Sequence, residues 1–168
     1  IEQVPRDQRL YGPGSGPIMA AFTHVNTQGS RFSAGLWGVF YAARELPTAV
    51  AETRYHHGRF LAATHEAPMH LPMRLYHVAI DAKLHDLRPV GAPSNAVYDE
   101  NDYAASRVLG AQLHGQGSAG VAYRSVRRQG GQCAGLFRPR GASRCLHAAF
   151  LLYAWDGAQF TDVYEKLA

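Results

Sequence analysis

Two stretches of the chain, residues 48–57 and 103–114, predict helices, the first from the residues at its ends and the second from the spacing of its apolar residues. In the second stretch Ala104, Val108 and Ala111 fall three or four positions apart. This spacing is typical of a helix that turns one face towards a core. We therefore expect a helix in each of the two stretches.

Residues at the ends of these stretches predict where the helices begin and end. Pro47 suits the first turn of a helix, because its missing amide hydrogen is not needed there. Gly58 is typical of the position just after the last turn. Asp102 can cap the second helix, and Gly115 would stop it.

The remaining apolar runs are short, rich in aromatic and β-branched residues, and predict strands. The predicted strands cover residues 37–42, 74–80, 120–126, 132–137, 147–155 and 159–164. Gly130 and Gly131 lie between the third and fourth, and Asp156 and Gly157 lie between the last two. Such dipeptides are typical of tight turns, so each of these pairs predicts a hairpin.

The order of these elements predicts the fold class. Strands come early, in the middle and late, two helices lie between them, and hairpins dominate the second half. This order favours an α+β fold with largely antiparallel sheets over a doubly wound parallel sheet. No Gly-x-Gly-x-x-Gly motif follows a strand, which argues against a Rossmann dinucleotide site. Residues 11–17 (YGPGSGP) predict a loop but lack the Lys-Ser/Thr ending of a phosphate-binding P-loop.

The chain has 168 residues, the size of one compact domain, which we place at residues 1–168. Its two cysteines, Cys133 and Cys145, indicate a reducing compartment without a disulfide framework. Apolar runs such as residues 148–155 are too short to cross a bilayer, and no charged-then-apolar leader opens the chain. We expect a cytoplasmic protein without membrane contact. The chain begins at Ile1 rather than Met, so a removed leader stays open as an alternative.

Arginine is distributed unevenly along the chain. Of 17 Lys and Arg residues 15 are Arg, and seven of these lie between Asp102 and Asp156, where there is no acidic residue. One interpretation is a genome that favours Arg codons together with ordinary solvated side chains. The other is a surface for anions, because the guanidinium fork binds phosphate and carboxylate with two hydrogen bonds. Nucleic acid, a phosphorylated cofactor and an acidic protein would all fit.

Three polar residues stand out near the first predicted strand and helix. Arg31 lies in a loop of small residues, Tyr41 lies at the end of the strand 37–42, and Glu52 lies in the most apolar part of the helix. A carboxylate in such a place is unfavourable unless it has a partner or a function. Each residue also has an ordinary reading: a loop Arg in a surface ion pair, a core Tyr and an exposed helix Glu.

Several segments together resemble the RES domain family over roughly residues 5–165. The matching segments are residues 31–33 (RFS), 38–43 (GVFYAA), 48–53 (TAVAET), 122–127 (AYRSVR) and 130–137 (GGQCAGLF). The family is named after an Arg, a Glu and a Ser, which fall here on Arg31, Glu52 and Ser125. The preceding residue, Arg124, stands where relatives often carry Pro.

The resemblance implies a single RES domain with a fold similar to the ADP-ribosyltransferase toxins, which bind NAD in a cleft between two small antiparallel sheets. It also implies a bacterial toxin of the type II toxin–antitoxin class that breaks the nicotinamide–ribose bond of NAD. The ADP-ribose would pass to water, phosphate or a protein target. The implied partner is an antitoxin with an Xre-like helix-turn-helix that blocks the cleft.

This chemistry gives each matched residue a role. Glu52 would stabilise the cationic ribose and act as general base towards the acceptor. Arg31 would bind the pyrophosphate or the ribose hydroxyls, and Tyr41 would stack on the nicotinamide. Arg31, Ser33, Tyr41, His56 and Ser125 are the expected NAD-binding residues, with Glu52, Arg31 and Tyr41 catalytic. A solvent-facing Ser125 and an ordinary surface His56 are the alternatives.

Three other functions are alternatives to NAD cleavage. A metal site is disfavoured because His56, His57, His65 and His70 match no standard zinc spacing, and the two cysteines form no CxxC motif. A basic RNA- or DNA-targeting toxin or nucleic-acid-binding module would suit the Arg-rich stretch, but no nucleic-acid motif is legible. A binding module without catalytic activity is the third alternative, and the carboxylate of Glu52 in the apolar part of its helix argues against it. We expect NAD as substrate, no metal and no direct nucleic-acid partner.

The charge pattern also gives a hypothesis for inhibition. The Arg-rich segment 103–155 would frame the mouth of the cleft and receive an acidic or carboxylate-bearing part of the antitoxin. Charges on the rim of an interface act mainly on association rate and salt dependence. Reversal of Arg127 and Arg128 to Glu would therefore slow the capture of the toxin by its antitoxin.

Overall fold

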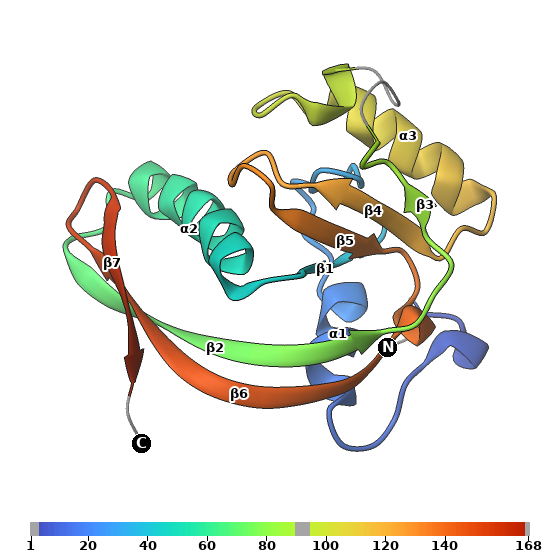
Figure 1. Ribbon diagram of the computed structural model, residues 1–168, viewed down its shortest axis with the longest axis horizontal. Coiled ribbons are helices and arrows are strands. Elements are labelled where there is room, and N and C mark those ends of the chain that lie inside the picture. The colour runs from blue at the N-terminus through green and yellow to red at the C-terminus, as the bar shows by residue number, and fades with distance from the viewer. Residues whose placement is uncertain (1–3, 90–94, 167–168) are drawn as a thin grey trace.

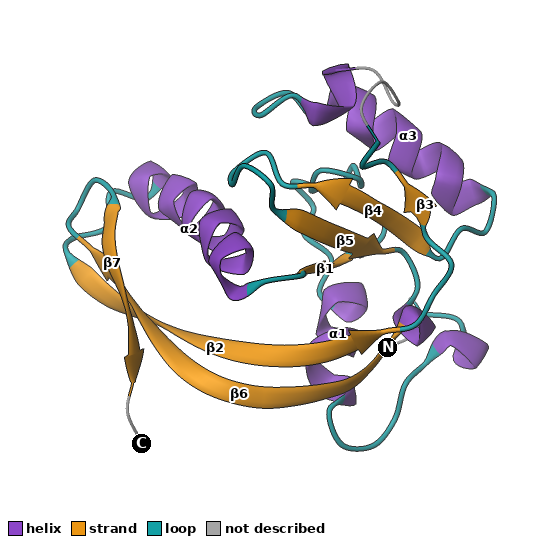
Figure 2. Ribbon diagram, viewed as in Figure 1, coloured by secondary structure: helices purple, strands orange, loops and turns teal. Residues whose placement is uncertain are grey.

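The computed structural model describes residues 4–89 and 95–166 as an α+β arrangement of two mainly antiparallel sheets with helices around them (Figures 1 and 2). The strands in these ranges are β1 (Phe40–Ala43), β2 (Met69–Ile80), β3 (His85–Asp86), β4 (Gly120–Arg124), β5 (Gln132–Leu136), β6 (Ala142–Trp155) and β7 (Phe160–Lys166). The helices in them are α1 (Ser15–Thr23), α2 (Leu46–Ala63) and α3 (Ala104–Gly115), with short 3-10 turns at Arg6–Gln8, Asn95–Tyr98 and Pro139–Gly141. The predicted fold class is confirmed.

The two sheets differ in size and shape. The smaller strands form a four-stranded sheet in the order β1-β5-β4-β3, in which only the short β3–β4 pair is parallel. The long strands β2 and β6 pair over almost their whole length and curve below it, with β7 at the edge (Figure 1). In Figure 1, α3 lies beside the small sheet and α2 lies above the curved β2–β6 pair.

Both predicted hairpins are present. Strands β4 and β5 pair in antiparallel register from Gly120–Leu136 to Arg124–Gln132, and β6 and β7 pair on either side of the turn at Asp156. Strand β4 ends at Arg124 rather than at residue 126, because the hairpin turn begins there. The amide of Ser125 still donates to the carbonyl of Gly131 at 2.8 Å, so the turn stays closed.

The prediction that Gly58 ends the first helix is wrong, since α2 continues through it to Ala63. A β-carbon on Gly58 would lie 3.7–3.8 Å from the rings of Phe160 and Trp155, an ordinary van der Waals distance, so this position lies on the face of the helix that meets the second sheet. Tertiary packing overrides the local stop signal here. The position of Pro47 in the first turn is confirmed.

The limits of the second predicted helix are nearly right. Helix α3 runs from Ala104 to Gly115, so Gly115 is its last residue rather than the residue after it. The carboxylate of Asp102 accepts a hydrogen bond from the amide of Ala104 at 2.8 Å. This contact gives Asp102 the predicted capping function, although Tyr103 occupies the N-cap position itself.

Part of the predicted loop 11–17 is wrong, because α1 begins at Ser15. Gly14 precedes it with a φ of 78°, and a β-carbon there would lie 2.6 Å from the carbonyl oxygen of Cys145. The helix forms because it buries Ile18 and Phe22 where β5 and β6 meet. Its low amphipathicity and its many small residues hide this face in the sequence.

Three clusters of buried side chains hold the sheets and helices together. One lies between α3 and the small sheet, around Val121 and Leu113. A second surrounds α1, and the third packs Leu61 of α2 against Tyr153 and Trp155 of β6. The small sheet therefore packs on α3, the curved sheet packs on α2, and α1 contacts both sheets. Among the described residues, no helix is long and apolar enough to cross a membrane.

Candidate functional site

A cleft of about 960 Å³ lies between α2, β1, the loop before β1 and the start of α3. Its volume falls at the upper end of the range of about 300–1,000 Å³ that is usual for small-molecule sites. Its polar lining includes the acidic residues Glu52 and Asp102 and the basic residues Arg31, Arg59 and Arg107. The cleft therefore combines one carboxylate on α2 with guanidinium groups from three separate segments.

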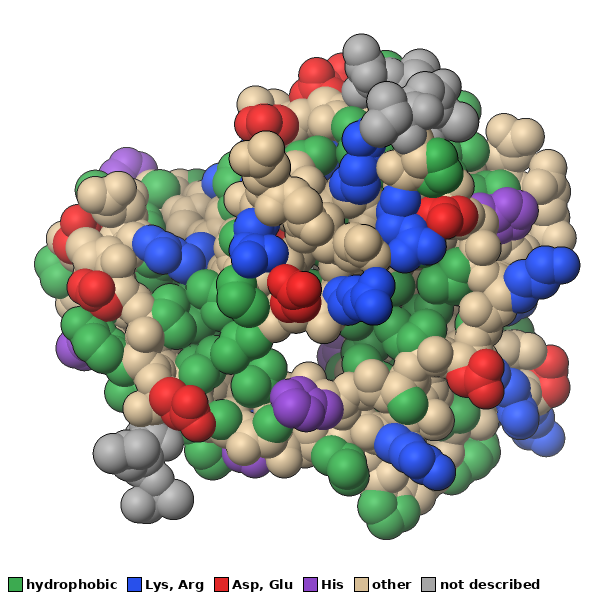
Figure 3. All heavy atoms as spheres, viewed as in Figure 1, with side chains coloured by type: hydrophobic (Ala, Val, Ile, Leu, Met, Phe, Trp, Pro, Cys, Tyr) green, Lys and Arg blue, Asp and Glu red, His purple; other side chains and the backbone are tan. Residues whose placement is uncertain are grey.

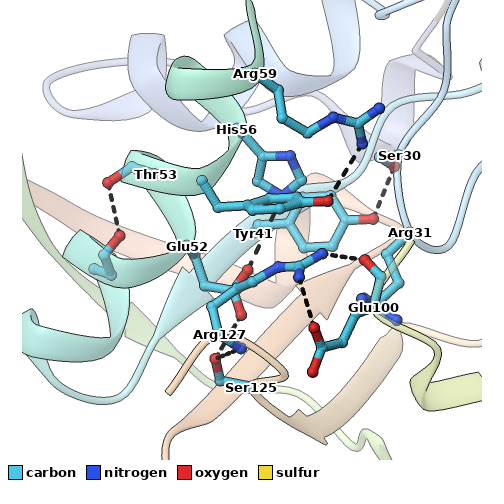
Figure 4. Close-up of polar contacts among 12 residues, drawn as sticks. Ser30, Arg31, Tyr41, Glu52, Thr53, His56, Arg59, Glu100, Ser125 and Arg127 are labelled. Carbon is cyan, nitrogen blue, oxygen red and sulfur yellow. Dashed lines mark hydrogen bonds and ion pairs between the residues drawn. The ribbon is translucent and has the colours of Figure 1, made fainter. Parts of the chain in front are cut away.

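Glu52 lies on the wall that α2 gives to the cleft (Figure 4). Its side chain is 20 % exposed, and its Oε1 accepts a hydrogen bond of 2.6 Å from the hydroxyl of Ser125. The second oxygen, Oε2, lies 4.0 Å from Nε2 of His56, one turn further along the helix. The structure thus brings together the Glu and the Ser that the resemblance singled out, which are 73 positions apart in sequence.

Ser125 contacts Glu52 from behind and is not among the residues that line the cleft. Its oxygen also accepts hydrogen bonds from the amides of Arg127 at 3.0 Å and Arg128 at 3.1 Å. Two amide donors orient the hydroxyl, so that its single hydrogen points to the carboxylate. The geometry therefore indicates that Ser125 orients Glu52 and does not itself contact a ligand in the cleft.

Arg31 is buried at the opposite side of the cleft, with 7 % of its surface exposed. Its Nη1 donates to the carbonyls of Val97 at 3.1 Å and Asp99 at 3.0 Å, and its guanidinium lies 4.4 Å from the ring centre of Tyr103. A buried charge is stable only when paired or hydrogen-bonded, and these contacts supply the bonds without neutralising it. Arg31 therefore brings a buried, hydrogen-bonded positive charge to the cleft.

Tyr41 lies within β1 rather than at its end. Its hydroxyl is hydrogen-bonded to the hydroxyl of Ser30 at 2.8 Å and accepts the amide hydrogen of Phe32 at 3.1 Å. Although 36 % of the residue is exposed, desolvation raises the pKa of Tyr41 to about 12, and the two hydrogen bonds oppose the shift. The phenol is neutral at physiological pH, and it anchors the loop that carries Arg31.

Ser33 is buried among the residues at the edge of the cleft. Its hydroxyl donates to the carbonyl of Trp37 at 2.7 Å and accepts from the amide of Gly35 at 3.2 Å. The side chain therefore holds the turn between Arg31 and β1. In the RFS motif, Ser33 therefore stabilises the turn that follows Arg31.

His56 lies half exposed on the cleft side of α2, and desolvation lowers its pKa. Glu52 opposes the shift, whereas Arg127, Arg31 and Arg59 add to it. The imidazole is accordingly neutral at pH 7 and can accept a proton. This property suits a group beside Glu52 that helps an acceptor to lose its hydrogen.

The contacts of His56, His57 and His114 predict how stability depends on pH. Desolvation lowers the pKa of all three imidazoles, so the folded chain takes up their protons at lower pH than the unfolded chain does. The unfolded state binds more protons below about pH 6.5, and the free energy of unfolding should fall there. We expect a lower urea midpoint at pH 5.5 than at pH 7.5. The difference should shrink in the double variant His56→Gln/His57→Gln, and a midpoint that does not fall would contradict the account.

Two cleft residues were not singled out from the sequence. Tyr103 packs against Arg31, and Arg107 of α3 donates to the carbonyls of Ser30 and Gln28 at 3.0 Å each. Both contacts join segments more than 70 positions apart, and no spacing pattern predicts them. Only the excess of Arg in the second half of the chain pointed towards Arg107.

The Arg-rich segment does not form the single basic rim that was predicted. On the face seen in Figure 3, acidic side chains lie among the basic ones rather than apart from them. Arg127 is 9 % exposed and pairs with Glu100, while Arg140 donates to the carbonyl of Asp7 far along the chain. The premise that Arg127 is an exposed docking charge is therefore wrong, because its guanidinium is used inside the fold. Arg128 is partly exposed and pairs with Glu45 at 3.2 Å.

Within residues 4–89 and 95–166, no group of three or more His, Cys, Asp and Glu side chains is arranged to hold a metal ion. Cys133 and Cys145 are both free and buried. Burial raises the pKa of Cys133, which also lines the cleft, to about 12. Its thiol is therefore protonated and a poor nucleophile.

Comparison with known proteins gives two matches. The family model described as "RES domain" matches residues 8–156, nearly the whole chain. The chain is also similar to "Uncharacterized protein y4oC" of Sinorhizobium fredii (strain NBRC 101917 / NGR234), with 26 % identity over 146 residues. That alignment covers 87 % of this chain, which spans only 60 % of the relative's length.

Proposed function

Because the chain belongs to the RES domain family, we propose that it takes NAD as its substrate and cleaves the bond between nicotinamide and ribose. The observation that carries this proposal is the pair of Glu52 and Ser125 on one side of a cleft and Arg31 on the other. A carboxylate on one wall and a guanidinium on the other suit a ligand that becomes cationic at one end and is anionic at its centre.

The reaction needs only one carboxylate. When the bond between the ribose C1 and the nicotinamide nitrogen breaks, its electron pair stays on nitrogen and neutralises the pyridinium ring. The leaving group therefore needs no proton, unlike the alcohol that leaves in ordinary glycoside hydrolysis. Positive charge develops on the ribose, where Glu52, held by the Ser125 hydroxyl, would stabilise it.

The acceptor then attacks C1 and loses a proton, for which the chain offers Glu52 and the neutral imidazole of His56 4.0 Å away. Water, phosphate and a protein side chain are all acceptors that this pair would serve. On the far side, Arg31 and Arg107 would bind the pyrophosphate, and the ring of Tyr41 would pack against the nicotinamide. The positions of these side chains around the cleft support the proposed roles.

In the cell the proposed activity makes the chain a cytoplasmic toxin of a type II toxin–antitoxin pair. An Xre-like helix-turn-helix antitoxin is the partner proposed to block the cleft. A bacterium that produces the chain alone should stop growing while its NAD falls or one of its proteins gains ADP-ribose. Normal growth with unchanged NAD and no modified protein, at soluble wild-type expression, would overturn the proposal. The Glu52→Gln variant, produced at the same level, is the control for slow growth that is caused by protein production alone.

Arg31 should affect both the substrate and the fold. In Arg31→Lys the charge remains, but one ammonium cannot hold the carbonyls of Val97 and Asp99 and also grip a pyrophosphate. We expect the KM for NAD to rise about 10- to 100-fold, the range for losing a hydrogen bond to a charged group, with a lower Tm. The matched control Arg44→Lys changes an exposed Arg outside the cleft and should alter neither. A KM within error of wild type would count against the binding role.

A further inference from the structure

Arg127 lies in the turn between β4 and β5, behind the cleft rather than in its lining. It is 9 % exposed, and its guanidinium stacks 3.3 Å from the ring centre of Tyr55, on the helix that carries Glu52 (Figure 4). Its amide donates to the Ser125 oxygen at 3.0 Å, and the Ser125 hydroxyl donates to Glu52. One residue thus contacts both the helix and the hydrogen-bond partner of the carboxylate.

The same guanidinium also reaches the opposite side of the cleft. It donates to the carbonyl of Glu100, lies 3.7 Å from the Glu100 carboxylate and donates to the Tyr103 hydroxyl at 3.3 Å. The ring of Tyr103 lies 4.4 Å from the guanidinium of Arg31. A continuous chain of contacts therefore runs from Glu52 through Ser125, Arg127 and Tyr103 to Arg31.

This arrangement is not optimised for stability. The Nε of Arg127 is buried and has no hydrogen-bond acceptor within the described residues. Leaving a buried donor without a partner is unfavourable, and such a group needs an explanation beyond ordinary packing. Glu100, its ion-pair partner, is 66 % exposed, so the pair itself adds little stability.

We propose that Arg127 is a positioning residue, which holds Glu52 and Arg31 at a fixed separation across the cleft. The proposal rests on the proposed NAD chemistry for its effect on rate, but the mechanical link can be measured without substrate. The planar fork can stack on Tyr55 while it bonds Glu100 and Tyr103, which no other side chain can do. A displacement of about 1 Å between reacting groups can reduce a rate about 100-fold.

The test compares Arg127→Met and Arg127→Lys with the matched control Arg124→Met. Arg124 lies in the same hairpin and stacks on an aromatic ring, Tyr98 at 4.5 Å, but contacts neither α2 nor the Ser125 hydroxyl. For Arg127→Met we expect kcat to fall about 10- to 100-fold while the KM for NAD changes much less. Arg127→Lys should remain as slow, because charge without the fork does not restore the contacts. Arg124→Met should keep the wild-type kcat.

Hydrogen exchange without NAD provides the second measurement. Amides of residues 46–57, the part of α2 that carries Glu52, should exchange faster in Arg127→Met than in wild type, and at the wild-type rate in Arg124→Met. Full activity of Arg127→Lys, or equal effects of the Met variants at both positions, would overturn the proposal. If the wild-type chain releases no nicotinamide, the proposed function fails, and the exchange comparison alone decides whether Arg127 holds the helix.

Discussion

Glu52→Gln should lower the rate of nicotinamide release by about 10²–10³-fold or more, the usual effect of removing one group that stabilises charge in a transition state. Glutamine keeps the size of the side chain, and its amide oxygen can still accept the Ser125 hydrogen bond of 2.6 Å. Only the negative charge that faces the developing ribose cation is lost. The fold should be unchanged, with the same circular dichroism and nearly the same Tm.

The matched control is Glu66→Gln, which changes an exposed glutamate after the end of α2. Its carbonyl accepts a hydrogen bond from Trp155, a backbone contact that the substitution preserves. This variant should retain the wild-type rate. If a folded Glu52→Gln protein turned over NAD as fast as wild type, the catalytic role would belong to another residue.

Gly110→Ala should destabilise the protein strongly, although alanine normally favours a helix interior by roughly 0.5–1 kcal/mol over glycine. A β-carbon on Gly110 would lie 2.0 Å from the carbonyl oxygen of Phe32, so α3 would have to move away from the loop that carries Arg31. The hydroxyl of Ser106 would lose its 2.7 Å hydrogen bond to the Arg31 carbonyl and keep only the 3.1 Å contact with the Tyr103 carbonyl within the helix. Overpacking of this kind costs about 1–3 kcal/mol or more, and the Tm should fall by roughly 2–4 °C for each kcal/mol.

Gly115→Ala is the control for this prediction. It lies in the same helix, and a β-carbon there would have no atom within 4 Å. The Tm should stay the same or rise slightly, as the helix propensity of alanine predicts. Equal Tm values for the two variants would show that α3 does not depend on its close contact with Phe32.

The sequence predicted the parts of the fold that depend on local pattern. The turn dipeptides Gly130-Gly131 and Asp156-Gly157 predicted both hairpins, and the spacing of apolar residues predicted α3 nearly to the residue. Where long-range packing decides, the local signals failed. Gly58 is a stop signal that α2 passes, and the turn beyond it buries Leu61 against Tyr153 and Trp155.

In the candidate site too, some features could be predicted from the sequence and others depend on long-range contacts. Arg31, Tyr41 and Glu52 stood out through their surroundings and the family resemblance, and all three line one cleft. Ser125 and Ser33 belong to the same motifs. In the structure, however, the Ser125 hydroxyl donates to Glu52 and the Ser33 hydroxyl donates within the turn before β1. These assignments depend on hydrogen bonds that no spacing encodes.

Arg127 was misread because charge counts say nothing about burial. It lies in a segment without acids, but its partner Glu100 and its stacking ring Tyr55 come from earlier parts of the chain. The fold therefore buries this one arginine and pairs it with an acid, which a count of charges along the sequence does not reveal.

The most direct test of the account is the incubation of purified wild-type chain with NAD, with phosphate and a bacterial lysate supplied as acceptors, and chromatography of the products. The account predicts that free nicotinamide appears in step with the loss of NAD, and that Glu52→Gln releases almost none. Omitting each acceptor in turn would identify where the ADP-ribose goes. Intact NAD after incubation with folded wild-type protein, with both acceptors present, would contradict the account.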